Sequence, residues 1–229
     1  MRQRGAGLGW LLLPGVPAAL LLAGFALFLG QSRAKPQVPL QRTDGIAVLT
    51  GGPERVEAGL RLLAEGKAAH LIVSGVGRSA ELADLARSNN VPAAALPAVA
   101  LPLTVERLDG DEATDAPPPE GPALTPPAPS AVTPPTVTLG RFATSTRGNG
   151  MEIADWAREH GIHSLRVVTA GYHMPRSLLE LRRNLPDVLL VPHPVQAQGP
   201  RPGLLAREYA KLIGAMFGLS ALKTDAPPR

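Results

Sequence analysis

A histidine and an arginine lie three residues apart in the segment Gly-Tyr-His-Met-Pro-Arg, which follows an apolar run at 164–170. With an ordinary pKa of about 6.5, His173 can give or take a proton near neutral pH. Arg176 can hold an anion through charge-assisted hydrogen bonds. Pro175 is typical of the first turn of a helix, which places His173 at a strand-to-helix junction. We therefore interpret His173 as a candidate general acid or base. The alternative is that it only caps the helix.

A glycine pair follows another apolar run, at 45–50, and could bring backbone amides close to a ligand. Gly51 and Gly52 precede Arg55, which is expected in the first turn of the next helix. Paired glycines let the backbone approach a ligand, and the amino end of a helix favours an anion. A cation at that position opposes the helix dipole, and an anionic ligand would relieve the conflict. The alternative is that Gly51 and Gly52 form a plain tight turn.

Small polar residues mark two further turns. Ser74 and Gly75 end a third apolar run, and Thr146 and Asn149 precede a predicted helix at 150–160. Either Thr146 or Asn149 is expected to cap that helix, since side chains of this type accept from the first free amides. The same side chains could instead hydrogen-bond a ligand.

The elements that must position these residues alternate between strands and helices. The runs at 45–50, 69–74 and 164–170 are apolar without polar alternation, as buried parallel strands are. The remaining expected elements are a strand at 188–192 and helices at 54–65, 150–160, 175–184 and 204–219. This order predicts an α/β fold, a Rossmann-like three-layer sandwich with a mainly parallel sheet. Ligands bind beyond the carboxyl ends of such strands, so the turns should share one pocket. Its expected lining is Arg55, His173 and Arg176, with Thr146 and Asn149 beside it.

One segment interrupts the alternation. Eleven of the 25 prolines of the chain fall within 97–135, and 103–135 carries six acidic residues against one arginine. This composition cannot bury a core, so we predict a disordered or polyproline-like insert in the α/β domain at 43–220. A passive surface insertion and a partner-docking loop are both compatible with it. Residues 221–229 are expected to form a disordered tail.

The amino-terminal segment indicates a membrane. Residues 5–32 carry no charge. A run of this length can span a hydrocarbon core of about 30 Å. We predict a spanning helix at 8–30 within an anchor at 1–36. The alternative is a cleavable signal peptide, although the run exceeds the usual apolar region of about 7–15 residues. Basic residues flank both ends of the run, so charge alone barely decides the orientation.

Composition limits the other classes. The chain has no cysteine, which excludes disulfides and Cys-based metal sites, and its five histidines lack a metal-ligand spacing. No dense Lys/Arg run with interleaved aromatics occurs, so the net charge of +4 gives little support for nucleic-acid binding. A membrane surface or an anionic ligand explains the basic excess better.

Several short segments together resemble a known family. Val168 and Thr169 are followed, after Ala170 and Gly171, by Tyr-His-Met-Pro-Arg-Ser, close to the family signature VTs-x-HMPRA. The other matching residues are Leu49-Thr50-Gly51-Gly52 with Arg55, Ser74-Gly75, and Thr146 with Asn149. These segments resemble the YdcF-like family of cell-envelope proteins (domain of unknown function 218), over roughly 44–80 and 137–211. In two places the chain departs from the family. Gly140 stands where many members carry Glu, and Gly150 where many carry Ala.

The resemblance implies a Rossmann-like fold and a role in envelope biogenesis, in peptidoglycan or surface-polysaccharide assembly. It implies Thr169 as a further ligand-binding residue, and it allows S-adenosylmethionine as a cofactor. It favours a soluble domain on the periplasmic side of a bacterial inner membrane. The expected partners are the lipid bilayer and a polar or anionic small molecule, such as an envelope precursor. A non-catalytic scaffold and a cytoplasmic S-adenosylmethionine-binding domain are the alternatives.

Overall fold

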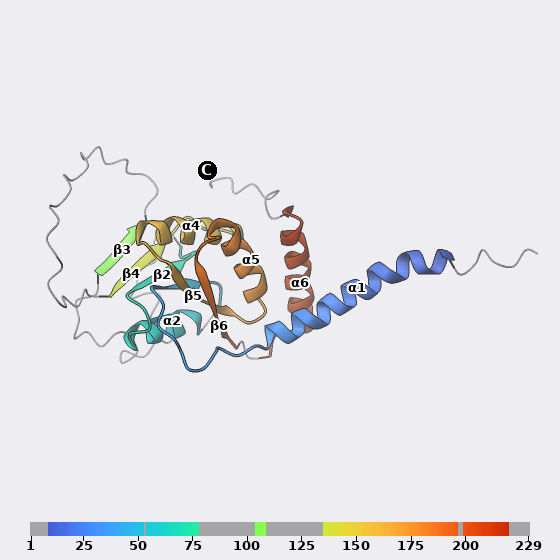
Figure 1. The fold of residues 1–229 in the computed structure, drawn as a ribbon, viewed down its shortest axis with the longest axis horizontal. Coiled ribbons are helices and arrows are strands. Elements are labelled where there is room, and N and C mark those ends of the chain that lie inside the picture. The colour runs from blue at the N-terminus through green and yellow to red at the C-terminus, as the bar shows by residue number, and fades with distance from the viewer. Residues whose placement is uncertain (1–8, 53, 78–103, 109–134, 197–198, 220–229) are drawn as a thin grey trace, which may run out of the picture.

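Six parallel strands form the centre of the computed structural model, which describes residues 9–52, 54–77, 104–108, 135–196 and 199–219. The strand order is β3-β4-β2-β1-β5-β6 (Figure 1). The strands are β1 (Gly45–Leu49), β2 (His70–Ser74), β3 (Thr104–Leu108), β4 (Thr136–Gly140), β5 (Ser164–Ala170) and β6 (Leu189–Val195). All five neighbouring pairs are parallel, so the carboxyl ends of the strands lie at one edge.

Helices cover both faces of this sheet. Helix α2 (Arg55–Ala64) packs with Leu60 and Leu63 on one face, against alternate side chains such as Val48. Helices α4 (Thr146–Glu159) and α5 (Met174–Asn184) pack on the other face, where Trp156 is fully buried. Each apolar strand thus buries both of its faces, which is why the strands read as unalternating runs. The predicted three-layer α/β fold is confirmed.

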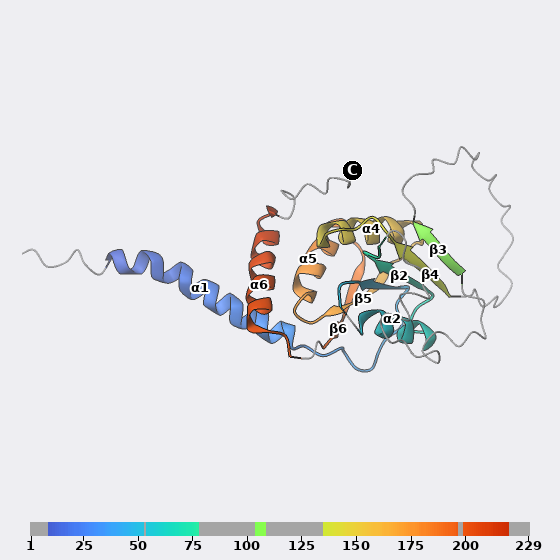
Figure 2. The same cartoon turned by 180° about the vertical axis from the view of Figure 1, so that it is seen from behind.

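Two further helices cross each other outside the sheet. Helix α1 (Gly9–Ser32) extends away from the domain. Helix α6 (Pro202–Met216) crosses the carboxyl-terminal half of α1 (Figures 1 and 2). The Tyr209 ring contacts Phe25 and Phe28, and its hydroxyl donates to the carbonyl oxygen of Leu21 at 2.9 Å. Within the described residues, α1 is the one helix long and apolar enough to cross a membrane.

The sequence missed two strands. Strand β4 was not predicted, and β3 lies inside the segment 97–135 that was expected to be a structureless insert. That expectation is wrong for Thr104–Leu108, because these five residues contain no proline and form a parallel ladder with β4. The rest of the acidic stretch, at 109–134, and the predicted tail at 221–229 lie outside the described residues. Strand β6 runs three residues further than predicted, and its two prolines suit an edge strand.

Candidate functional site

A cleft of about 570 Å³ opens where β1, β2 and β4 end. Its walls are the amino ends of α4 and α5 and one side of α6. The lining side chains that matter below are Thr50, Thr146, Arg147, Asn149, His173, Arg176 and Lys211. The cleft thus lies at the carboxyl edge of the sheet, where ligands of open α/β folds bind.

Arg176 joins three elements around the cleft. Its Nη1 donates to the hydroxyl of Thr146 on α4, and its Nη2 donates to Glu208 Oε2 on α6 at 2.7 Å. The same Nη2 lies 3.1 Å from Nδ1 of His173. Glu208 also accepts from Lys211 Nζ at 2.9 Å. The site is therefore a network of charged groups, in which Glu208 holds two of the cleft's cations in place.

Burial sets the charge states of this network. Burial lowers the pKa of His173 below its ordinary value, and the neighbouring charges of Arg176 and Arg55 add to this against the opposite effect of Glu208. Burial would raise the pKa of Glu208, but its contacts with His173, Lys211 and Arg176 outweigh that and hold this pKa well below its usual range. His173 is therefore neutral at neutral pH, while Glu208 is ionised.

A neutral His173 has a defined role. A guanidinium has only donors, so Nδ1 accepts from Arg176 and the ring proton resides on Nε2. In this tautomer the Nε2–H group of His173 can donate a hydrogen bond to a ligand. If the ring becomes protonated, Nδ1 can turn its new proton to Glu208 Oε2, 3.4 Å away.

Arg55 reaches the same edge but does not line the cleft. It is only 4% exposed, and its Nη1 donates to the carbonyl oxygens of Leu49 at 3.2 Å and Thr50 at 2.9 Å. Its Nη2 donates to the Tyr172 hydroxyl at 3.4 Å. These acceptors, and not a ligand, satisfy the cation at the start of α2. The prediction that Arg55 lines the pocket beside Arg176 is therefore wrong. The charge of Arg55 nevertheless contributes to the lowered pKa of His173.

The predicted glycine turns divide in the same way. Gly51 and Gly52 surround the Arg55 guanidinium and are outside the cleft lining, so they shape the β1–α2 turn. Gly75 does line the cleft, with a φ of +78° that favours glycine. A Cβ at Gly75 would lie 2.9 Å from Thr50 Oγ1 and 3.0 Å from Asn149 Oδ1. This turn therefore has to be glycine for β1, β2 and α4 to meet.

Glu152 is a buried acidic residue that the sequence analysis missed. Its Oε2 accepts from the Ser74 hydroxyl and from the Gly75 amide at 3.3 Å, and its Oε1 accepts from the Phe142 amide at 2.7 Å. A Cβ at Gly140 would lie 2.4 Å from this carboxyl group. The space beside β4 that Gly140 leaves open, where many YdcF-like proteins carry Glu, is thus filled by a carboxylate from α4.

The amino end of α4 begins earlier than predicted. Ser145, and neither Thr146 nor Asn149, is the capping residue, and its hydroxyl accepts from the Gly148 amide at 3.0 Å. This leaves Thr146 free to bind Arg176. Asn149 accepts from the Ser74 hydroxyl at 3.3 Å and lines the cleft. Of the two predicted roles, capping is therefore wrong for both residues.

Thr169 and Ser74 stand behind the cleft. Both are fully buried, and neither lines it. Ser74 acts through Asn149 and Glu152, whereas the Thr169 hydroxyl has no hydrogen-bond partner in the described part of the chain. The structure thus brings Gly75, Thr146, Asn149, His173 and Arg176 together around one space. It places the other five predicted residues (Gly51, Gly52, Arg55, Ser74 and Thr169) in the surrounding shell.

Charge and shape define what the cleft can hold. Its charged lining residues, Arg147, Arg176 and Lys211, are all cations. The amino end of α4 adds the positive end of a helix dipole. Among the described residues, no group of three or more His, Cys, Asp or Glu side chains is placed to hold a metal ion.

Comparison with protein-family models and with curated proteins gives no match to this chain.

Proposed function

We propose that the chain is a membrane-anchored protein that binds an anionic small molecule in the cleft at the carboxyl edge of its sheet. The observation that carries this proposal is the set of three cations around the amino end of a 14-residue helix. Glu208 accepts from Arg176 and Lys211 and so holds both cations in position. Glu208 itself does not line the cleft. An anion in the cleft would accept from Arg147 and Arg176.

The biological setting follows from the family resemblance. The segment around His173 resembles the YdcF-like signature, and members of that family are linked to the cell envelope. We therefore propose an envelope-biogenesis role with a phosphorylated or otherwise anionic precursor of peptidoglycan or surface polysaccharide as the ligand. His173 lines the cleft, which makes it the candidate acid or base if the protein is an enzyme.

An uncleaved anchor fits the contacts of α1 better than a signal peptide does. Tyr209 of α6 packs on Phe25 and Phe28, and Gln196 donates to the Ala34 carbonyl oxygen at 2.7 Å. Cleavage near residue 34 would expose the side of α6 that these aromatic rings cover. We propose that α1 stays in the inner membrane and that the domain lies on the periplasmic side.

S-adenosylmethionine is a poorer fit to the cleft. The three lining cations suit its carboxylate, but they would repel its sulfonium, and the described part of the lining contains no carboxylate to accept from its ribose. The non-catalytic scaffold is the second candidate. Arg55, Ser74 and Glu152 bind other groups of the protein, so their role is to stabilise the fold.

The test is a binding titration on the detergent-solubilised full chain with inorganic pyrophosphate and with S-adenosylmethionine. Arg147→Ala removes a lining cation without touching the Glu208 network, and Arg42→Ala removes one at the opposite edge of the sheet. We expect pyrophosphate binding to weaken about tenfold in Arg147→Ala, which is the scale of one charged hydrogen bond, and to be unchanged in Arg42→Ala. Equal affinities in both variants would refute the anion site, and binding of S-adenosylmethionine alone would favour the alternative.

A further inference from the structure

Helix α6 has two faces of opposite character. One face carries Glu208, Lys211 and Ala215 at helical spacing and forms a wall of the cleft. The opposite stripe, at positions i, i+4, i+7 and i+11, consists of Ala206, Ala210, Ile213 and Phe217. Ala206 and Ala210 are exposed, and Phe217 is 78% exposed. The helix therefore presents an uncharged stripe that is exposed at Ala206, Ala210 and Phe217 and half-buried at Ile213.

The position of this stripe relative to α1 indicates what covers it. Tyr209 fixes α6 to α1 between Leu21 and Phe28, inside the apolar window of α1. Gly24 makes this close approach possible, since a Cβ there would lie 2.4 Å from the Tyr209 hydroxyl. The 24 residues of α1 are about 36 Å long, whereas a hydrocarbon core of about 30 Å needs about 20 residues. A span that starts near Gly9 would then end near Phe28, at the level of α6.

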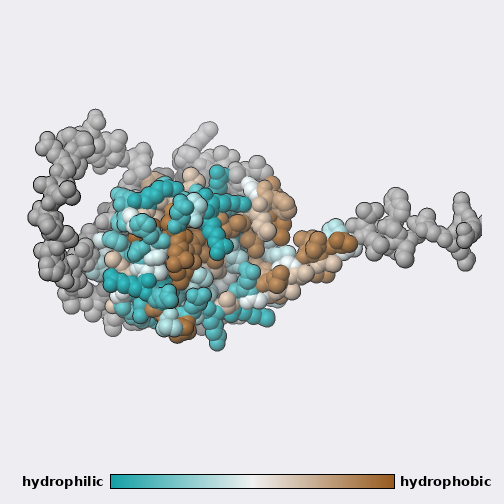
Figure 3. Space-filling view, viewed as in Figure 1, coloured by the Kyte–Doolittle hydropathy of each residue, from teal (hydrophilic) through white to brown (hydrophobic). Residues whose placement is uncertain are grey.

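Charge placement agrees with a membrane surface at this level. Arg33 and Lys35 follow α1, Arg201 directly precedes α6, and Arg207 lies beside the outer stripe of α6; the burial pattern leaves all four exposed. The one acidic residue of α6, Glu208, faces the cleft and is neutralised there. Figure 3 shows apolar residues gathered over α1 and the adjoining side of α6. Apolar residues on one face with basic residues at its border are typical of helices that lie in a bilayer interface.

We infer that α6 is a second membrane-contacting element, lying in the interface of an anionic bilayer with Ala206, Ala210, Ile213 and Phe217 towards the lipid. The cleft then opens beside the headgroups, because it lies on the other face of the same helix. This inference rests on the membrane anchor of the proposed function but not on the identity of the ligand.

The experiment uses single cysteines in the full chain, which has no natural cysteine. Ala210→Cys and Phe217→Cys report on the outer stripe of α6, and Leu20→Cys, at a residue 68% exposed on α1, reports on the anchor. Asp155→Cys on α4 is the matched control, since that side chain is 75% exposed away from α1. Each variant carries a polarity-sensitive fluorophore and is reconstituted into phosphatidylglycerol-containing vesicles with nitroxide-labelled lipids.

We expect the emission at positions 20, 210 and 217 to shift to shorter wavelength and to be quenched by the nitroxide lipids, with no change at 155. Quenching at 20 without quenching at 210 and 217 would overturn the inference while leaving the anchor intact. Absence of quenching at 20 would refute the anchor and the inference together. A disulfide-linked dimer through Ala210→Cys, with no lipid quenching, would show that a second copy of the chain covers the stripe.

Discussion

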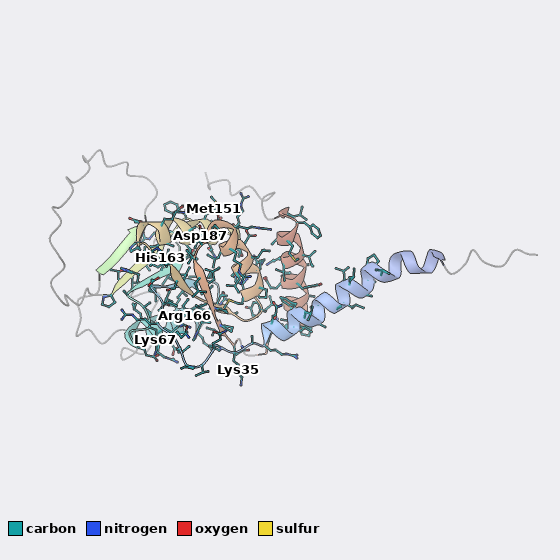
Figure 4. The ribbon with its side chains drawn as sticks, viewed as in Figure 1. Lys35, Lys67, Met151, His163, Arg166 and Asp187 are labelled. Carbon is teal, nitrogen blue, oxygen red and sulfur yellow. The ribbon has the colours of Figure 1, made fainter. Side chains whose placement is uncertain are left out.

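The two edges of the sheet carry similar residue types but use them differently. At the amino edge, Asp44 and three histidines (His70, His160 and His163) surround a hollow of about 480 Å³. Figure 4 places His163 at the end of the domain away from α6. At the carboxyl edge, one histidine and Glu208 meet three cations. On residue types alone, the amino edge would be the stronger candidate for a histidine-based site.

Hydrogen bonding separates the two edges. Asp44 accepts from the amides of His163 at 3.1 Å and Ser164 at 2.7 Å, and from the Ser164 hydroxyl at 2.8 Å. Its carboxylate therefore holds the start of β5 and serves the backbone. Among the described residues Glu208 instead binds side chains that line the cleft, Arg176 and Lys211, and it is 6% exposed. A site is thus recognised by buried charges that converge on a space, more than by the number of histidines around it.

The sharpest test of this difference neutralises one carboxylate at each edge. Glu208→Gln leaves Arg176 and Lys211 without their counter-charge, so we expect a loss of about 3 kcal/mol in the free energy of unfolding. Asp44→Asn removes a surface interaction with the backbone and should cost about 1 kcal/mol. Urea unfolding of both variants in the same detergent measures the two values. Equal losses of unfolding free energy would mean that Glu208 and Asp44 stabilise the protein to the same extent, and that Glu208 has no special role as a buried charge.

Acid should reduce the effect of the Glu208 substitution. The pKa of Glu208 is lower in the folded chain than its ordinary value of 4.5. The stability that its charge contributes is therefore complete above about pH 4.5 and is lost as the pH falls through the folded pKa. The difference in unfolding free energy between the wild type and Glu208→Gln should narrow below about pH 4.5. A constant difference down to pH 3 would show that the charge of Glu208 is not the cause.

A second test concerns the carboxylate of Glu152, which occupies the space beside Gly140. Gly140→Ala would push a methyl group into Glu152, and overpacking of this kind costs about 2 kcal/mol. Glu152→Gln puts an amide NH2 against the Gly75 or Phe142 amide and should cost about as much. Glu159→Gln is the control, because Glu159 is exposed on the same helix. Thermal unfolding should leave the control unchanged and lower the melting temperature of the other two.

The sequence predicted the parts of this edge that depend on strand order. The apolar runs specified β1, β2 and β5, and parallel pairing then brought Gly75 and His173 to one place, since strand ends share an edge. The sequence could not predict Glu208 or Glu152. Both lie on amphipathic helices among exposed charges, and only packing decides which charge turns inward. Glu208 and Lys211, three residues apart on α6, were a weak signal of an ion pair.

Arg55 shows the limit of reasoning from helix dipoles. Its position in the first turn of α2 was predicted correctly, but the sequence does not show that the carbonyl oxygens of Leu49 and Thr50 turn back towards it. Strands β3 and β4 were missed because each has only five residues and lies within or next to the proline-rich segment at 97–135. Such short segments are stabilised by their neighbours in the sheet more than by their own composition.

A third test asks whether the geometry of Arg176 matters beyond its charge. Arg176 binds Thr146, His173 and Glu208 together, which the planar guanidinium allows and a lysine ammonium cannot reproduce. Arg176→Lys should weaken pyrophosphate binding by about 1.5 kcal/mol, roughly tenfold. Arg42→Lys at the amino edge should leave it unchanged. Titration calorimetry on the two variants decides, and unchanged affinity in Arg176→Lys would mean that charge alone is sufficient.

The smallest effect is expected at the amino-edge histidine that most resembles a site residue. His163 is exposed, and its contact with Asp44 is made by its backbone amide, which His163→Ala retains. The substitution should therefore change the unfolding free energy by no more than about 0.5 kcal/mol, with no change in pyrophosphate affinity. His173→Ala should weaken that affinity, because Arg176 loses the Nδ1 acceptor that orients it across the cleft. If His163→Ala weakened pyrophosphate binding as much as His173→Ala does, the ligand would lie at the amino edge and the assignment of the cleft would be wrong.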